Sequence, residues 1–177
     1  MLRAAGVDFD IRPAAVDEAA IKRKMLGMDA ACIAQALADT KALAKPGDLV
    51  LGADSVVELD GMLIGKCASR VEAASLLSRL SGKTHRLVSA AALARKGEIV
   101  WRHLGEARLT MRALSEAFIA DYLTAEGDAL LACVGCYRLE GRGAQLFESF
   151  EGDYFSILGL PLLPLLAELR RQQVLGS

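Results

Sequence analysis

The segment Leu51–Lys66, LGADSVVELDGMLIGK, constrains the fold more than any other part of the chain. The apolar run Leu49–Leu51 predicts a short buried strand, and Asp54 follows at its expected end. Asp60-Gly61 predicts a type I′ hairpin turn, because that turn needs positive φ at both central residues. The returning chain reaches Lys66, so the segment predicts an acid and a lysine in one cleft. An ordinary surface hairpin with a turn aspartate is the alternative, and spacing alone does not separate the two.

The size and composition of the chain favour one domain covering residues 1–177, with room for two lobes. Hydrophobic residues make up 53% of the chain and aromatic residues only 5%, so aliphatic side chains and alanine must fill the core. The net charge of −1 gives no overall attraction to nucleic acid or to an anionic membrane. A phosphate ligand therefore has to be held by a few local lysines and arginines.

The cysteines give only a weak signal for metal or redox chemistry. One CxxC and two histidines are few for a zinc site, and free cysteine usually behaves as a small buried hydrophobe. A thiol redox protein built on the CxxC is therefore the weakest alternative. The four cysteines are Cys32, Cys67, Cys133 and Cys136.

The ends of the chain predict a cytoplasmic protein without a membrane partner. Met1-Leu2-Arg3 leads directly into an amphipathic segment with no signal-peptide pattern. The longest apolar stretch, 157–167, is too short to span a bilayer and contains Gly159, Pro161 and Pro164.

The order of predicted elements indicates an α/β or α+β protein with a mixed, curved sheet. Hairpins are too frequent for a strictly parallel, doubly wound fold. Helices are predicted from cap residues and apolar periodicity, and strands from long extended runs. The expected elements are a strand at 7–12, a helix at 29–44, a helix from Ser69, strands at 84–94 and 98–111, a helix from Ser115, further strands within 130–150, and a helix at 161–173.

Two further features carry chemistry only if they meet a ligand. Lys41 continues the helical face of Ile33 and Leu37, so its ammonium either snorkels to water or reaches a polar cleft. This pattern alone favours the first interpretation, in which the aliphatic part of the lysine side chain lies along the edge of the core. The loop at 140–143 holds one acid, one base and two glycines, which permit close backbone approach to a ligand. A glycine-rich turn is its alternative.

Taken together, these segments resemble the Maf family of nucleoside triphosphate pyrophosphatases, also called septum-formation inhibitor proteins. The matches run in order over almost the whole chain, and as an ordered set they are highly specific. They are VDE (16–18), the lysine of ADTKA (38–42), GADSVVELDG (52–61) with Gly65-Lys66, LSG (80–82) with Thr84-His85, EGRGAQLF (140–147) and EGDYFSILGLPL (151–162).

The resemblance implies a Maf-type, inosine triphosphatase-like α/β fold: a mixed curved sheet with flanking helices, and two lobes around a nucleotide cleft. It implies attack of water on the α-phosphorus of a nucleoside triphosphate, which yields the monophosphate and pyrophosphate. A divalent cation assists, usually Mg²⁺ with Mn²⁺ as the alternative. A homodimer is also implied.

The resemblance assigns roles to particular residues. Asp54 matches the general base or metal-orienting acid, and Glu18 lies in the same cleft as a second metal candidate. Lys41 and Lys66 match the side chains that hold phosphate oxygens. These roles agree with the chemistry, since a triphosphate needs cations to neutralise its charge. The remaining substrate positions are Ser55, Glu140 and Gly141.

The chain departs from the family pattern at two places. Family members open with a strand and a Ser- and Arg-bearing loop before the first helix. Residues 1–3 match the interior of that helix, so we expect the chain to lack this loop and its phosphate-binding arginine. Cys67 stands where the family usually has proline, which changes local rigidity.

Glu140 indicates which nucleotide the chain prefers. The pyrimidine-preferring branch, which acts on dTTP and UTP, has glutamine at this position. An ionised glutamate only accepts hydrogen bonds, so it suits the two N–H donors on a guanine edge, and a cationic methylated base strengthens the pairing. The sequence thus resembles the branch that acts on 7-methyl-GTP, with the pyrimidine branch as the alternative.

An alternative from another class is a non-catalytic, nucleotide-binding regulator of septum formation that acts through a protein partner. The presence of Asp54, Lys41 and Lys66 favours the enzyme, whereas the expected absence of the N-terminal loop leaves room for the regulator. Nucleic-acid binding is disfavoured, because the chain has neither a basic patch nor an aromatic platform.

Overall fold

A computed structural model describes residues 1–176 of the chain. The chain forms two compact units. The first unit combines Met1–Ser55, Ser89–Gly105 and the chain from Gly159 onward, and the second combines Val56–Val88 with Glu106–Leu158. Each unit is therefore assembled from segments that are distant in the sequence.

One five-stranded sheet supplies strands to both units, in the order β2-β1-β3-β4-β5. The predicted α/β class with flanking helices is confirmed, although the sheet is antiparallel and not mixed. β1, β3 and β4 each contribute residues to both units. The strands are β1 (Val50–Leu59), β2 (Met62–Ile64), β3 (Thr84–Arg95), β4 (Glu98–Met111) and β5 (Phe147–Gly152).

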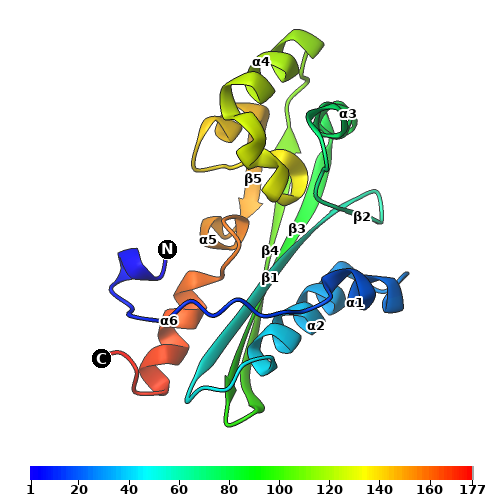
Figure 1. Cartoon of the computed structure of the whole chain (residues 1–177). Helices are drawn as coiled ribbons and strands as arrows, with labels where there is room; N and C mark the ends of the chain where they lie inside the picture. The colour runs from blue at the N-terminus through cyan, green and yellow to red at the C-terminus, as the bar shows by residue number, and fades with distance from the viewer. Residues whose placement is uncertain (177) are drawn as a thin grey trace. The chain divides into compact units, whose positions relative to one another are not determined.

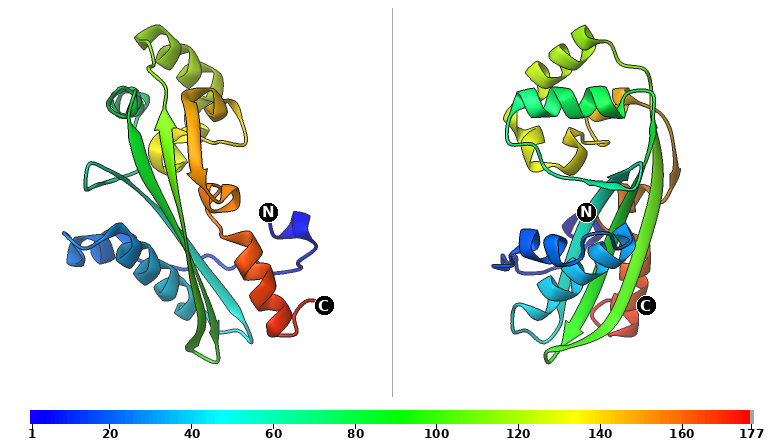
Figure 2. Two further views of the ribbon diagram at one scale, coloured as in Figure 1. Left: turned by 180° about the vertical axis from the view of Figure 1, so that it is seen from behind. Right: turned by 90° about the vertical axis from the view of Figure 1, so that its right-hand side faces the viewer.

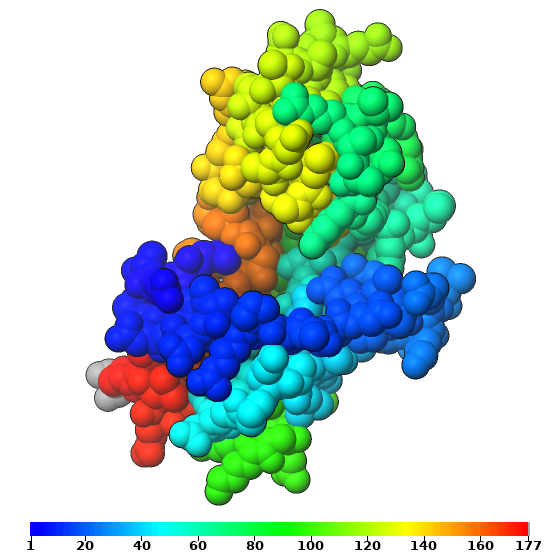
Figure 3. All heavy atoms as spheres, viewed as in Figure 1, coloured from blue at the N-terminus to red at the C-terminus, as the bar shows by residue number. Residues whose placement is uncertain are grey.

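The first unit packs three α-helices around its part of the sheet: α1 (Glu18–Lys24), α2 (Ala30–Leu43) and α6 (Leu162–Arg171). In Figure 1, α2 lies to the right of these strands and α6 to the left, and the view from behind in Figure 2 keeps them on opposite sides. The N-terminal segment crosses the front of this unit from α6 to α1 (Figure 3). The predicted strand at 7–12 is wrong, because these residues form no regular element.

The second unit has its own core under α3 (Arg70–Leu80) and α4 (Glu116–Glu126). The two helices pack on each other, and α3 also contacts the 3-10 turn η3 (Val134–Cys136). The strands predicted within 130–150 are largely wrong. This stretch forms η2 (Gly127–Ala132), η3 and η4 (Arg142–Leu146) before β5 begins, and the short helix α5 (Tyr154–Ile157) follows.

The central hairpin has the predicted turn but a different strand. Asp60 and Gly61 both have positive φ, at 53° and 78°, which confirms the I′ prediction. β1 runs without a break from Val50 to Leu59, so the prediction that a strand ends at Asp54 is wrong. Asp54 lies in the middle of β1.

None of the helices in residues 1–176 combines the length and apolarity that a bilayer span requires.

Candidate active site

The first unit gathers one lysine and two carboxylates. Lys41 Nζ on α2 lies 2.6 Å from Asp54 Oδ1 on β1 and 2.7 Å from Glu18 Oε1 at the start of α1. Three of the residues expected in the site are therefore in direct contact, although 36 positions separate the first from the last in the chain. We call this set the Lys41 cluster.

Close packing of β1 on α2 brings Asp54 to Lys41. A Cβ atom at position 52 would collide with the carbonyl oxygen of Ala38 and the amide nitrogen of Ala42, so only glycine permits this approach. Residues two apart on a strand face the same side, so Asp54 points toward α2 as Gly52 does. The glycine and the two alanines therefore set the distance between the carboxylate and the lysine.

Cap residues fix the two helices that hold the rest of the cluster. The Asp29 carboxylate accepts a hydrogen bond from the Ala31 amide and starts α2, as its sequence predicts. Asp17 accepts from the Ala20 amide and starts α1, which places Glu18 in the first turn of that helix. Glu18 therefore enters the site from a capped helix end.

The Lys41 cluster changes the proton affinity of its members. Burial raises the pKa of Asp54, and the Glu18 charge raises it further, which outweighs the lowering by Lys41. Burial lowers the pKa of Lys41, but the hydrogen bonds and charges of Asp54 and Glu18 leave it above its ordinary value. Lys41 therefore remains a cation, while Asp54 accepts a proton more readily than a free aspartate does.

One carboxylate oxygen of the cluster lacks a hydrogen-bond partner. Asp54 Oδ2 is buried and has no hydrogen-bond partner among residues 1–176. Within the same range, no group of three His, Cys, Asp or Glu side chains forms a metal cage. Mg²⁺ prefers oxygen ligands and usually retains several waters, so it needs only one or two carboxylates. Asp54 and Glu18 fit this requirement.

Ser55 lies apart from the Lys41 cluster. Because neighbouring residues on a strand face opposite sides, its side chain leaves the sheet face that carries Asp54. Its hydroxyl lies 2.6 Å from the Ser89 hydroxyl on β3, and a Cβ atom at Gly159 would lie 3.5 Å from it. Ser89 is thus a polar partner that sequence reasoning missed. It lies 34 residues from Ser55 in the sequence, and only the folded sheet brings the two hydroxyls together.

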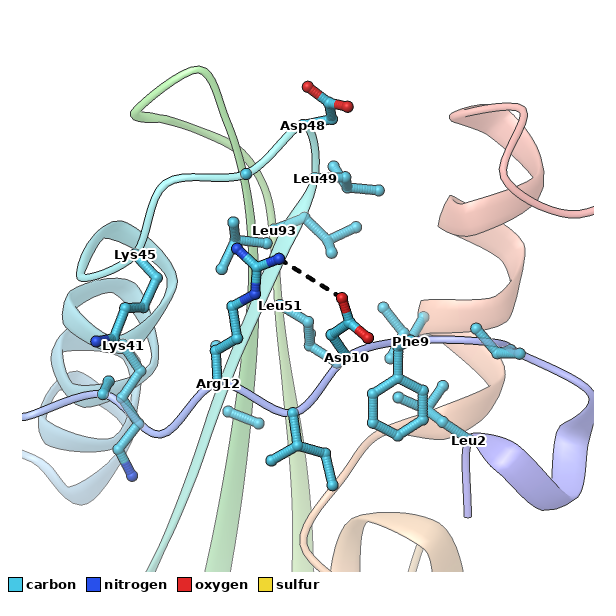
Figure 4. Close-up of a pocket in the computed structure, with 18 of the residues that line it drawn as sticks. Leu2, Phe9, Asp10, Arg12, Lys41, Lys45, Asp48, Leu49, Leu51 and Leu93 are labelled. Atoms are coloured by element: carbon cyan, nitrogen blue, oxygen red, sulfur yellow. Dashed lines mark hydrogen bonds and ion pairs between the residues drawn. The ribbon is translucent and has the colours of Figure 1, made fainter.

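A pocket of about 700 Å³ in the first unit borders the cluster and includes Glu18 and Lys41 in its lining. Figure 4 shows Lys41 on α2, Lys45 just after the end of that helix, Leu51 on β1, and Arg12 and Asp10 on the N-terminal segment. Arg12 Nη2 lies 3.5 Å from Asp10 Oδ2. Arg12 and Lys45 add cations that sequence reasoning missed, because no motif marks either residue.

The other predicted site residues belong to the second unit. Lys66 is exposed and follows β2. Glu140 and Gly141 are exposed and precede η4, in a loop that begins after Tyr137. Gly143 closes this loop, since a Cβ atom there would collide with the Arg138 backbone.

Comparison with known proteins places the chain in a family. The Maf family, described as Maf-like protein, matches residues 1–172. Since that match covers nearly all of the sequence, the chain belongs to the family of Maf-like proteins.

Individual relatives agree with this assignment. A protein of Nitrobacter winogradskyi named nucleoside triphosphate pyrophosphatase is 48% identical over 99% of this chain and 89% of its own length. Two proteins named 7-methyl-GTP pyrophosphatase are also similar. The one from Brucella abortus is 43% identical over 100% of this chain and 92% of its own, and the one from Mesorhizobium japonicum is 48% identical over 96% and 88%.

Proposed function

We propose that this chain hydrolyses a nucleoside triphosphate to the monophosphate and pyrophosphate. The Lys41 cluster is the observation that carries the proposal, because it joins a fixed cation to a buried carboxylate with one unpartnered oxygen. The names of the relatives, nucleoside triphosphate pyrophosphatase and 7-methyl-GTP pyrophosphatase, support the same reaction.

Asp54 is the proposed base of this reaction. Water must be oriented toward the α-phosphorus and lose a proton, and a carboxylate in hydrogen-bond reach can do both. Burial raises the Asp54 pKa, which improves its ability to accept that proton. Lys41 holds Asp54 in place and offers its positive charge to the phosphate oxygens.

A divalent cation, Mg²⁺ with Mn²⁺ as the alternative, is proposed as the cofactor. Asp54 Oδ2 and Glu18 are the carboxylate groups that would hold it. When bound, the cation supplies charge that neutralises the phosphate oxygens. Lys66, from the second unit, is proposed to hold a further phosphate oxygen.

The nucleobase of the substrate is proposed to be recognised by Glu140, Gly141 and Ser55. The preferred substrate is proposed to be 7-methyl-GTP. The exposed Glu140 carboxylate offers acceptors only, which suits the N–H donors of a guanine edge. A pyrimidine triphosphate remains the alternative. A homodimer, a cytoplasmic location and the role of a septum-formation regulator stay predictions.

Pyrophosphate release with Mg²⁺, across GTP, 7-methyl-GTP, UTP, dTTP and ITP, tests the proposal. Release that prefers 7-methyl-GTP and is lost in Asp54→Asn is the expected result. A preference for UTP or dTTP would support pyrophosphatase activity and refute the proposed preference for a guanine nucleotide. Binding of the nucleotides without any release would refute catalysis and favour the regulator.

A further inference from the structure

A pair of serine hydroxyls joins β1 to β3 in the first unit. Ser55 Oγ and Ser89 Oγ lie 2.6 Å apart, a short O–H···O hydrogen bond in which either oxygen can be the donor. Ser89 is completely buried, whereas Ser55 is only partly buried. Ser55 is therefore the member of the pair that a ligand can touch, and Ser89 can act on that ligand only through Ser55.

Ser89 is an exception within its own strand. Residues Leu87–Ala94 are all buried, and Ser89 is the one polar side chain among them. Burial of a hydroxyl is unfavourable unless the hydroxyl is hydrogen-bonded. The next three positions of β3 are alanines, so packing of this strand does not require a polar atom. The hydroxyl of Ser89 is therefore best explained by its contact with Ser55.

The serine pair shares a sheet face with the lining of the large pocket. Leu51 and Ala53 of β1 and Leu93 of β3 line the pocket of about 700 Å³ in the first unit. Residues two or four apart on a strand face the same side, so Ser55 and Ser89 lie on the same face of the sheet as these three side chains. The Ser55 hydroxyl thus adds one polar group to an apolar surface, the combination that is typical of sites for small organic ligands.

Gly159, between α5 and α6, keeps the space beside this hydroxyl free of a side chain. A Cβ atom at position 159 would lie 3.5 Å from Ser55 Oγ, within ordinary contact distance. The φ of Gly159 is 98°, a conformation that other residues rarely adopt. The fold therefore favours glycine at the position where a larger residue would begin against the Ser55 hydroxyl.

The direction of the hydrogen bond decides what Ser55 offers to a ligand. A serine hydroxyl has one proton to donate and can accept two hydrogen bonds. If Ser55 donates to Ser89, a ligand meets only an acceptor at Ser55. If Ser89 donates to Ser55, the Ser55 proton stays available for an acceptor atom of the ligand.

A guanine nucleotide needs such a donor. Its base carries the acceptor O6 next to the N–H donors that Glu140 is proposed to bind. An ionised carboxylate only accepts hydrogen bonds, so Glu140 cannot serve O6. Recognition of the whole guanine edge therefore requires a second side chain with a proton to donate.

We propose that Ser89 is a positioning residue that donates its hydroxyl proton to Ser55 Oγ, so that Ser55 donates its own proton to O6 of a guanine nucleotide. The proposal rests on the proposed function, which assigns Ser55 to recognition of the nucleobase. It adds the direction of the hydrogen bond, the atom that Ser55 meets and a role for the buried Ser89. Selectivity then depends on how well the atom at purine position 6 accepts a hydrogen bond.

The test measures how strongly the full chain prefers GTP to 6-thio-GTP. The analogue keeps both N–H donors and replaces O6 by sulfur, which is a weak acceptor. For the wild type, kcat/KM should be about 5-fold higher with GTP, the usual effect of one neutral hydrogen bond. In Ser89→Ala the preference should fall below about 2-fold, because Ser55 loses the partner that fixes its hydroxyl.

Further variants show whether Ser89 acts through Ser55. Ser55→Ala and the double variant should have the same low preference as Ser89→Ala, since residues that act through one contact are not additive. Ser89→Thr keeps the hydroxyl and should restore most of the preference. Thr84→Val is the matched control, because it removes a hydroxyl that lies 2.9 Å from Thr110 Oγ1 between β3 and β4 of the second unit. Its preference should equal that of the wild type.

Calorimetry with GMP and 6-thio-GMP in the presence of Mg²⁺ gives a second readout that needs no hydrolysis. The ratio of the two Kd values should follow the same pattern across the variants. A chain that shows this pattern but releases no pyrophosphate from any triphosphate would refute the proposed hydrolysis and still establish the role of Ser89.

Three results would overturn the proposal itself: equal treatment of the oxygen and sulfur nucleotides by the wild type, an unchanged preference in Ser89→Ala, or a preference in the double variant that is clearly lower than in Ser55→Ala. The first would show that Ser55 does not donate to O6. The second and third would show that Ser89 does not act through Ser55.

Discussion

The two units bury ionisable side chains in opposite ways. In the first unit, Lys41 is held by two carboxylates, and Asp54 keeps one buried oxygen without a partner. In the second, His85 is 2% exposed, and its Nε2 lies 2.8 Å from the Tyr137 hydroxyl between aromatic rings. His85 Nδ1 is also buried without a hydrogen-bond partner among residues 1–176. Burial of paired charges is nevertheless more costly than burial of a neutral imidazole, which carries no charge to desolvate. The first arrangement is therefore suited to chemistry and the second to stability.

The largest expected effect is the loss of activity on substitution of Asp54, which should change catalysis much more than stability. Asp54→Asn removes the proposed base and should lower kcat by about 10³-fold, within the usual range for a catalytic acid or base. Its unfolding free energy should change little, because the amide no longer requires desolvation of a charge. Steady-state pyrophosphate release and urea unfolding measure the two quantities.

Asp39→Asn is the matched control for this variant. Asp39 also lies on the first unit, where it accepts hydrogen bonds from Arg102 and Gln35, but it does not contact Lys41. Its kcat should stay within about 3-fold of the wild type, since it holds no proposed chemical role. A loss equal to that of Asp54→Asn would show that any carboxylate change in this unit is harmful.

Lys41→Met should be the next largest change, and it should affect both activity and stability. Loss of the cation should lower kcat by about 10²-fold. It also leaves two carboxylates together, which should cost about 2 kcal/mol, less than a fully buried pair because the Glu18 side chain is 37% exposed.

Lys41→Arg keeps the charge and is the control for stability. Lowering the pH from 8 to 5 should recover part of the stability of Lys41→Met, because protonation of Asp54 removes the repulsion between the carboxylates. Urea unfolding at both pH values checks this. Equal stability of Lys41→Met and wild type at pH 8 would contradict the account of the cluster.

The third prediction concerns His85, where acid should destabilise the fold. Burial lowers the pKa of His85 to about 4, below its ordinary 6.5, so the unfolded chain binds this proton first. The stability is therefore fully present above pH 6.5 and is lost as the pH falls toward 4. Between pH 7 and 4.5 the loss should be about 2–3 kcal/mol.

Urea unfolding of the wild type and of His85→Gln at pH 7 and 4.5 isolates this contribution. Glutamine can still meet the Tyr137 hydroxyl but does not titrate, so the variant should lose about 2–3 kcal/mol less on acidification. The same pH dependence in both proteins would assign the acid sensitivity to other groups, such as the carboxylates of the first unit.

The features that the sequence predicted well depend on neighbouring residues. The sequence predicts helices that begin at Asp29 and Ser69, and each of these side chains accepts a hydrogen bond from an amide in the first turn of its helix. The Asp60-Gly61 turn was identified because positive φ restricts the residue types that can form it. Such signals need only a few residues of context, so the sequence carries them in full.

The features that the sequence missed depend on distant residues. Residues 7–12 alternate as a strand does, but a strand forms only with a partner, and the pattern names none. Asp54 was placed at a strand end, because Gly52-Ala53 reads as a break until the close contact of Gly52 with α2 is known. Family resemblance selected Asp54, Lys41 and Glu18, but only the fold places both carboxylates on one ammonium.

The smallest expected effect is a change in nucleotide preference on substitution of Glu140, the residue of the second unit that is proposed to recognise the nucleobase. Glu140→Gln replaces two acceptors by one acceptor and one donor, so one N–H of a guanine edge loses its partner. The preference for 7-methyl-GTP over UTP should fall about 10-fold, which corresponds to about 1.4 kcal/mol. The measurement is the ratio of the two kcat/KM values. Glu148→Gln, an equally conservative change at an exposed site on β5, should leave that ratio unchanged. If both variants shift the ratio alike, the effect is one of net charge, and Glu140 does not recognise the base.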